Sequence, residues 1–184
     1  MGLAGRYTAE PSPLDEEALQ IELSKKQIPP EDYARILAEK KAHAMGVSMS
    51  NKGEVILIIG SDTIVDLNGS IMEKPKDEAD AFEMIRRLSN NWHRVHTGVA
   101  VYHHDEKLFS FTDTANVKFA SLTDEDINSY IASQEPMDKA GSYGIQGIGG
   151  QLVERMEGDF FTVMGLPMHR LSRELSKAIQ MLDV

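Results

Sequence analysis

The feature that most constrains this chain is an apolar run, Glu54-Val-Ile-Leu-Ile-Ile-Gly-Ser-Asp-Thr-Ile-Val65. The run is rich in Ile and Val and is too short to cross a bilayer, which predicts a β-strand covered on both faces. Asp62 lies at the predicted end of that strand. Ligands of open α/β sheets gather where strands end, so Asp62 is a candidate catalytic carboxylate. The structural alternative is a carboxylate that caps a turn or accepts backbone N–H bonds.

Length and charge limit the classes of function. The 184 residues are enough for one domain, 1–184, with a full core. The formal net charge of -10 argues against a nucleic-acid polymer or an anionic membrane as partner, because both require a basic surface. A small anionic substrate is still compatible with this charge. It requires a local group of lysines and arginines, or a divalent metal.

The sequence lacks most of the motifs that would indicate a cofactor or a cellular compartment. The chain has no cysteine, so it has neither disulfides nor thiolate metal ligands. It shows no membrane-spanning run and no signal-peptide core, which makes a cytoplasmic location the default expectation. The adjacent His103 and His104 face opposite sides of a strand and do not form a zinc motif. We find no P-loop, no dinucleotide fingerprint and no nucleophile elbow.

Helices are expected in five places. Asp15, Glu16 and Glu17 indicate an acidic helix start, and Pro29-Pro30 precedes a helix that runs to about Met45. Asp77 is a helix cap for a helix that ends near Ser89, and Thr123 opens a capping box. The last helix follows Gly165-Leu-Pro167, and its expected core stripe is Leu171, Leu175, Ile179 and Leu182. Lys40 and Lys41, within the second of these helices, are by themselves surface charges.

Strands and loops complete the pattern. Asn68-Gly69 between apolar residues predicts a hairpin. Lys74 and Lys76 lie in the loop before the Asp77 cap, where a helix N-terminus favours an anion. Further strands are expected at 95–102, at 108–113, at 117–119 and between Gly150 and Gly158. Residues 136–147, PMDKAGSYGIQG, form a glycine-rich segment without periodicity, which is either a structural loop or a site of close backbone approach.

Six phrases in this order resemble one known family. They are GSDTIV, EKPKD, RLS, HTGV, EPMDKAGSYGIQG and GDFFTVMGLP. Together they resemble the Maf family, named for septum formation inhibitors, and the Maf domain of acetylserotonin O-methyltransferase-like proteins. The resemblance covers nearly the whole chain. It implies an α/β fold with a mixed twisted sheet flanked by helices, two lobes with a central cleft, and a homodimer.

The resemblance also implies an activity and a set of residues. Members are nucleoside triphosphate pyrophosphatases, which convert a nucleoside triphosphate to the monophosphate and pyrophosphate as housekeeping of the nucleotide pool. For this chain the expected substrates are pyrimidine nucleotides (dTTP, UTP, CTP) or modified nucleotides. Asp62 matches the family's proton acceptor for the attacking water, and Glu16, Lys41 and Lys74 match its other catalytic positions. Thr63 and Gln146 match positions linked to base selection.

The same resemblance implies a divalent metal and several contacts to the phosphates. Glu16 and Asp62 are the expected ligands of Mg²⁺ or Mn²⁺, since hard cations take carboxylate oxygens. Lys41 and Lys74 are expected to face phosphate oxygens, and Lys76 and Lys139 are further substrate-binding candidates. Lys139 has an alternative role, an internal ion pair with Asp138 that shapes the glycine-rich segment.

The chain departs from the family pattern at its N-terminus. Family members begin with a strand and an S-x-S-P-R-R loop whose arginines bind the triphosphate, and this chain joins the pattern only after them. Glu73 also replaces the usual Gly before Lys74-Pro75. Lysine does not replace the bidentate contacts of arginine. The alternative hypothesis is therefore a catalytically weak, nucleotide- or partner-binding member with an open strand edge.

Overall fold

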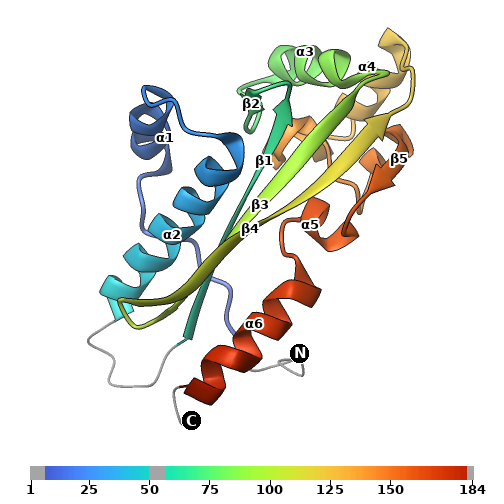
Figure 1. Ribbon diagram of the computed structural model, residues 1–184. Helices are drawn as coiled ribbons and strands as arrows, with labels where there is room; N and C mark the ends of the chain where they lie inside the picture. Colours follow the sequence, from blue (N-terminus) through green and yellow to red (C-terminus); the bar gives the residue numbers. More distant parts are fainter. Residues whose placement is uncertain (1–6, 50–56, 182–184) are drawn as a thin grey trace.

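The computed structural model describes residues 7–49 and 57–181. One five-stranded sheet forms its centre, with helices on both faces (Figure 1). The strand order is β2-β1-β3-β4-β5, and each neighbouring pair is antiparallel. The α/β fold with a helix-flanked sheet is confirmed, with antiparallel pairing in place of a mixture of strand directions.

Three long strands, β1, β3 and β4, and two short ones make up the sheet. The bounds are β1 Leu57–Leu67, β2 Ser70–Met72, β3 Trp92–His103, β4 Glu106–Phe119 and β5 Val153–Glu157. The predicted hairpin joins β1 to β2, with positive φ at Asn68 (54°) and Gly69 (87°), as a type I′ turn requires. The separate strands expected at 108–113 and 117–119 are wrong, because β4 is continuous through Thr114 and Asn116.

The strand β1 does not end at Asp62. Residues 54–56 of the predicted run lie outside the described residues, and β1 continues to Leu67, so that Asp62 lies mid-strand opposite Gly98 of β3. The prediction that this run is covered on both faces is also wrong at its start. Leu57 is 36% exposed and Ile59 is 39% exposed. The catalytic candidate is therefore held by a strand interior rather than by a loop.

One edge of β1 is open along most of its length. Pairing with β3 runs from Leu57 to Asp66, whereas pairing with β2 covers only Val65 to Leu67. Among the described residues, no strand lies beside the other edge of residues 57–64. The expected open edge therefore belongs to β1, and it decides where the cleft described below lies.

One helix, α2, Pro30–Met49, covers one face of the sheet and packs on β1 and β3 (Figure 1). The shorter α1, Glu16–Ser24, lies beside α2 and packs against it through Leu23. Asp15 is the N-cap of α1, in keeping with the predicted acidic helix start. Glycines at the sheet surface allow α2 to come close. A Cβ at Gly98 would lie 2.3 Å from the carbonyl oxygen of Ala34, and one at Gly60 would lie 2.5 Å from that of Ala38.

The opposite face carries the remaining helices. Its upper part packs against α3, Glu78–Leu88, and α4, Asp124–Ile131, around a core that includes Val95 and Phe119. Its lower part packs against α6, Met168–Met181, through Leu171 and Leu175. A short helix that the sequence did not predict, α5, Phe160–Met164, lies between these parts. The expected core residue Leu182 lies outside the described residues.

Local signals placed the caps of α3 and α4 correctly. The side chain of Asp77 accepts a hydrogen bond from the Asp80 N–H at 2.8 Å. Thr123 and Asp126 form the predicted capping box. The glycine-rich segment folds into short 3₁₀ turns, Glu135–Asp138 and Ala140–Ser142, followed by Ile148–Leu152. Within the described ranges, none of the helices has both the length and the apolar character that crossing a membrane demands.

Candidate active site

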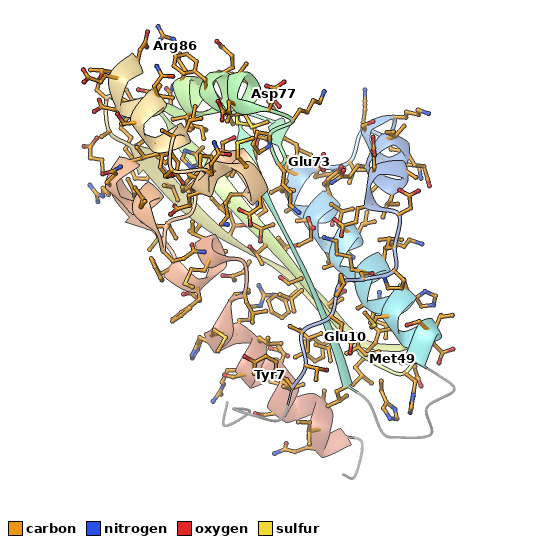
Figure 2. The ribbon with its side chains drawn as sticks, turned by 180° about the vertical axis from the view of Figure 1, so that it is seen from behind. Tyr7, Glu10, Met49, Glu73, Asp77 and Arg86 are labelled. Carbon is orange, nitrogen blue, oxygen red and sulfur yellow. The ribbon has the colours of Figure 1, made fainter. Side chains whose placement is uncertain are left out.

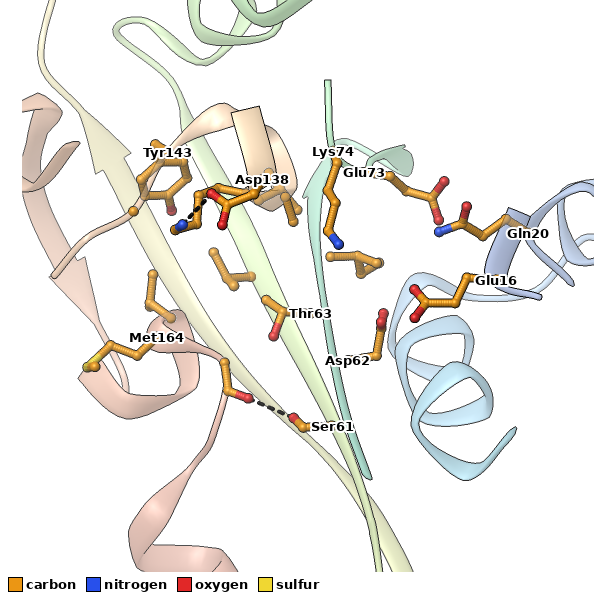
Figure 3. A pocket seen from close by; sticks show the side chains of 18 of the residues that line it. Glu16, Gln20, Ser61, Asp62, Thr63, Glu73, Lys74, Asp138, Tyr143 and Met164 are labelled. Atoms are coloured by element: carbon orange, nitrogen blue, oxygen red, sulfur yellow. Dashed lines mark hydrogen bonds and ion pairs between the residues drawn. The ribbon is translucent and has the colours of Figure 1, made fainter. Parts of the chain in front are cut away.

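A cleft of about 540 Å³ lies over the open edge of β1 (Figure 3). One wall comes from α1, the opposite wall comes from the glycine-rich segment and the end of α5, and residues 73–76 close one end. Side chains alternate between the two faces of a strand, so Asp62 and Thr63 of β1 point to opposite faces. Both line this cleft because the edge between them is uncovered. A strand with neighbours on both edges would not present side chains from both of its faces to one cleft.

Asp62 and Lys41 form an ion pair at the base of the cleft. The Nζ atom of Lys41 lies 2.6 Å from Oδ1 of Asp62 and 2.9 Å from Oε2 of Glu16. The side chains of Asp62 and Lys41 are 12% and 17% exposed, whereas that of Glu16 is 38% exposed. Lys41 is thus not a surface charge, because the close packing of α2 on the sheet brings it to the carboxylates.

The electrostatics of this group favour proton transfer near neutral pH. Burial raises the pKa of Asp62 to about 6, although Lys41 opposes the rise. Glu16 and Glu73 add smaller contributions that also raise it. Burial alone would lower the pKa of Lys41, but the carboxylates of Asp62 and Glu16 outweigh it and the pKa is raised. Lys41 therefore stays charged while Asp62 exchanges a proton close to pH 6.

Three more lysines line the same cleft. Lys74 and Lys76 come from the loop before α3, and Lys139 comes from the glycine-rich segment. Lys139 forms the ion pair with Asp138 that was the alternative expectation for it. It lines the cleft at the same time, so the pair does not remove its charge from the site. Together with Lys41 these cations supply the local positive charge that an acidic protein needs for an anionic ligand.

The other end of the cleft is less charged. Ser61, Thr63 and Met164 line it (Figure 3), while Tyr143 and Gln146 line the cleft from the glycine-rich segment. Here the glycine-rich segment comes close to the sheet. Gly141 has a φ of 64°, and a Cβ there would lie 2.6 Å from Cγ2 of Val65. This contact is the close backbone approach that was one of the two expectations for residues 136–147.

Glu135 fixes the shape of the glycine-rich segment. Its carboxylate accepts hydrogen bonds from the backbone N–H groups of Ile148 at 2.8 Å and Gly149 at 2.9 Å. It also accepts one from the hydroxyl of Tyr130 at 2.9 Å. These hydrogen bonds hold the turn that carries Gln146 to the cleft. Sequence reasoning did not single out Glu135, whose position before Pro136 carries no chemical signal of its own.

Sequence reasoning also missed the role of Glu73. Its side chain lines the cleft beside Lys74 (Figures 2 and 3). Its Oε1 accepts a hydrogen bond of 2.8 Å from the hydroxyl of buried Tyr33 on α2. Burial and the neighbouring Glu73 raise the pKa of Tyr33 above its usual range, so Tyr33 remains a donor. The departure of Glu73 from the family pattern was visible in the sequence, but its partner on α2 was not.

Seven of the eight predicted site residues line the cleft, and the eighth, Lys41, contacts two of them. The seven are Glu16, Asp62, Thr63, Lys74, Lys76, Lys139 and Gln146. The fold thus brings together residues that are as far apart as 130 positions in the sequence. Their individual roles in catalysis and binding stay predictions.

The carboxylates fit a metal that is shared with a substrate. Within the described part of the chain, no three His, Asp or Glu side chains are grouped closely enough to hold an ion by themselves. Mg²⁺ commonly uses one or two protein carboxylates and takes its other ligands from water and substrate phosphates. Glu16 and Asp62, which both contact Lys41, offer two carboxylates of the kind that such an arrangement needs.

Comparison with known proteins shows which family the chain is similar to. The family model for Maf-like protein matches residues 1–178. A protein from Clostridium novyi (strain NT) named dTTP/UTP pyrophosphatase is 46% identical over 140 residues, which are 76% of this chain and 72% of that protein.

Two further relatives carry the same name, dTTP/UTP pyrophosphatase. The one from Aquifex aeolicus (strain VF5) is 49% identical over 146 residues, which cover 78% of this chain and 74% of the relative. The one from Bacillus mycoides (strain KBAB4) is 46% identical over 148 residues, with 80% and 75% covered. The family match over nearly the whole sequence and this level of identity show that the chain belongs to the Maf family.

Proposed function

We propose that this protein hydrolyses pyrimidine nucleoside triphosphates, dTTP and UTP above all, to the nucleoside monophosphate and pyrophosphate. The observation that carries the proposal is the largely buried Asp62–Lys41 ion pair, with Glu16 in contact with Lys41, in a cleft that three further lysines line. The names of the relatives support the choice of dTTP and UTP. Members of one family that share this much sequence commonly share a reaction.

In the proposed reaction, Asp62 accepts a proton from water. The oxygen of that water forms a bond to the α-phosphorus, and the bond from the α-phosphorus to the bridging oxygen breaks, so that pyrophosphate leaves with the bond's electron pair. A base with a pKa near 6 is well matched to this step, because it is mostly ionised at neutral pH and still binds a proton. Lys41 holds the carboxylate of Asp62 at 2.6 Å and so fixes its direction.

Charge stabilisation accounts for the lysines in this scheme. Negative charge shifts to the leaving pyrophosphate as the bond breaks, and fixed cations stabilise it. Lys74, Lys76 and Lys139 line the cleft and are assigned to the β- and γ-phosphates. Glu73 lies beside Lys74, and its hydrogen bond with Tyr33 limits its freedom to pair with that lysine.

A divalent cation, Mg²⁺ or Mn²⁺, is part of the proposal. Glu16 and Asp62 would hold it, and bound there it would neutralise phosphate charge. Its charge would also offset part of the negative charge of the five carboxylates that line a cleft proposed for a polyanion, those of Glu16, Glu17, Asp62, Glu73 and Asp138. The protein's own part is to place Asp62, to keep Lys41 charged and to orient the phosphates.

A second candidate function is nucleotide binding with little or no turnover, or binding of a protein partner. It is favoured by one observation, that no arginine lines the cleft among the described residues. Arginine makes bidentate contacts to phosphate that lysine cannot copy. We also propose a cytoplasmic location, where nucleoside triphosphates are made and consumed. A homodimer stays a prediction of the family resemblance.

Hydrolysis of UTP in ¹⁸O-labelled water tests the proposed bond cleavage. We expect UMP and pyrophosphate in equal amounts, with the label in UMP, because water attacks the α-phosphorus. Label in pyrophosphate would show attack at the β-phosphorus, and formation of UDP and phosphate would show cleavage at the γ-phosphorus. Either result contradicts the proposed reaction. Tight binding of UTP without any product would place the second candidate first.

A further inference from the structure

Two hydroxyl groups line the less charged end of the cleft. Ser61 and Thr63 are two positions apart in β1, so both side chains point to the face that carries α5. Their hydrogen bonds lead away from the cleft into the protein. The direction of each bond decides whether the hydroxyl offers a ligand its proton or its lone pairs.

The direction of the bond at Thr63 follows from its neighbour in β3. Thr97 lies directly opposite Thr63 in the sheet, is fully buried, and its Oγ1 lies 2.8 Å from Oγ1 of Thr63. The same Oγ1 of Thr97 lies 2.7 Å from the backbone carbonyl oxygen of Thr162, which is a pure acceptor. A hydroxyl has one proton. Thr97 therefore donates to the carbonyl, and Thr63 must donate to Thr97.

Ser61 is restricted in the same way. Its Oγ lies 2.6 Å from the carbonyl oxygen of Gly165 and 3.1 Å from that of Gly98. Both neighbours are acceptors, so the single proton of Ser61 is also directed into the protein. Towards the cleft, Ser61 and Thr63 offer only lone pairs.

The acceptor carbonyl of Thr162 is held firmly. The hydroxyl of Thr162 donates to Oδ2 of Asp113 in β4 at 2.6 Å, and Arg170 of α6 lies 3.3 Å from Oδ1 of the same carboxylate. Gly165 ends α5 with a φ of 104°, and a Cβ there would lie 3.2 Å from Oγ1 of Thr63. The short helix α5 is thus fixed against the hydroxyl pair, and the direction of the two hydrogen bonds is fixed with it.

We propose that Thr97 is a positioning residue that sets the base preference of the cleft by making Thr63 an acceptor only. Uracil and thymine present an N–H donor at ring position 3, which complements such an acceptor. Cytosine has an unprotonated nitrogen there, so two acceptors would face each other. This inference rests on the proposed function, because it assigns a preference for UTP and dTTP over CTP to that same cleft.

The contact should produce a measurable preference. Leaving one buried polar group without its partner typically costs about 1–3 kcal/mol, which corresponds to a factor of roughly 5–150 in affinity. The protein should therefore bind UMP at least about fivefold more tightly than CMP, and the ratio of kcat/KM for UTP over CTP should show the same direction.

The Thr97→Val variant tests the role of Thr97 directly. Valine has nearly the same shape but cannot accept the proton of Thr63, which becomes free to donate to a ligand. The carbonyl of Thr162 keeps a donor, the N–H of Gly165 at 3.1 Å. We expect the ratio of UMP to CMP affinity, measured by calorimetry, to fall about tenfold. Thr97→Ser keeps the hydroxyl and should restore the wild-type ratio.

A purely structural role for Thr97 predicts a different pattern. Loosening of the site would weaken the binding of both nucleotides together and leave their ratio unchanged. If Thr97→Val does not fold, Thr63→Val provides a second test, since it removes the acceptor and should weaken UMP binding without weakening CMP binding. An unchanged ratio in the folded variant, or a wild-type protein that binds neither monophosphate, overturns the inference.

Parallel assays of turnover separate this inference from the proposed function. If the wild-type protein releases pyrophosphate from UTP but Thr97→Val leaves the ratio of UMP to CMP affinity unchanged, only the role of Thr97 is contradicted. If the protein turns over no triphosphate but prefers UMP in a way that depends on Thr97, the proposed reaction is contradicted and the inference about Thr97 is supported.

Discussion

At the scale of single residues, the chemistry of the cleft depends on the ion pair that Asp62 and Lys41 form in a largely buried position. Each charge would be costly alone in this position, and the contact of 2.6 Å keeps both in place. The attraction of Lys41 does not fully offset the effect of burial, because burial still raises the pKa of Asp62 to about 6. A carboxylate that is stabilised just enough to ionise near neutral pH is suited to accept a proton from water.

This balance predicts the pH dependence of the reaction. The active form of Asp62 is the carboxylate, so kcat/KM for UTP should rise with pH and level off above about 6. Lys41 favours the carboxylate, and its loss should raise the pKa of Asp62 further. In Lys41→Met we therefore expect lower activity and an acidic limb shifted to higher pH.

Lys40→Met is the matched control for this experiment, because Lys40 is the exposed neighbour on the same helix. Its profile should overlay that of the wild-type protein. An acidic limb that stays in place, or moves to lower pH, in Lys41→Met would show that the titrating group is not Asp62 in contact with Lys41.

At the scale of the elements, local signals in the sequence predicted most boundaries. Asn68-Gly69, Asp77 and Thr123 each fix a turn or a helix start through their own backbone preferences, and each lies where it was expected. Failures occurred where partners distant in the sequence decide the structure. Thr114 and Asn116 interrupt the apolar pattern of β4, yet pairing with β3 keeps the strand continuous.

The candidate site was predictable in part for the same reason. Resemblance to the family identified seven of the polar residues that line the cleft, but periodicity placed Asp62 at a strand end instead of mid-strand. Sequence offered no means to find Tyr33 beside Glu73, or Thr162 beside Thr97, since these contacts join elements far apart in the chain. Short α5 has only five residues, too few for helical periodicity to show.

The approach of α2 to the sheet gives a test at this scale. A Cβ at residue 98 would lie 2.3 Å from the carbonyl oxygen of Ala34 and 2.5 Å from the backbone nitrogen of Arg35. Gly98→Ala must therefore move the helix backbone, and such overpacking costs about 1–3 kcal/mol of unfolding free energy. The displaced helix carries Lys41, so turnover should fall as well.

Chemical denaturation and UTP hydrolysis together measure this effect. Val47→Ala, an exposed change on the same helix, serves as the control and should alter the unfolding free energy by less than about 0.5 kcal/mol. A denaturation midpoint for Gly98→Ala equal to that of the wild-type protein would contradict the close packing of α2 on β3.

At the scale of the whole molecule, the open edge of β1 connects the fold with the site. Strand β2 covers only the last three residues of β1, which leaves the edge at Asp62 and Thr63 free to line a cleft on both faces. One face provides the carboxylates and Lys41, and the other provides the hydroxyl groups beside α5. The molecule thereby separates a charged end, proposed for the phosphates, from a less charged end, proposed for the base.

The most direct test of the whole account is pyrophosphate release from UTP and dTTP with Mg²⁺ by the wild-type protein and by Asp62→Asn. The account predicts release by the wild-type protein and a loss of at least about 100-fold in the variant, because a positioned base contributes about that much or more. The variant should remain folded in a thermal melt, since Glu16 still pairs with Lys41 and the amide avoids the burial of a charge. Wild-type turnover in a folded Asp62→Asn variant would contradict the account.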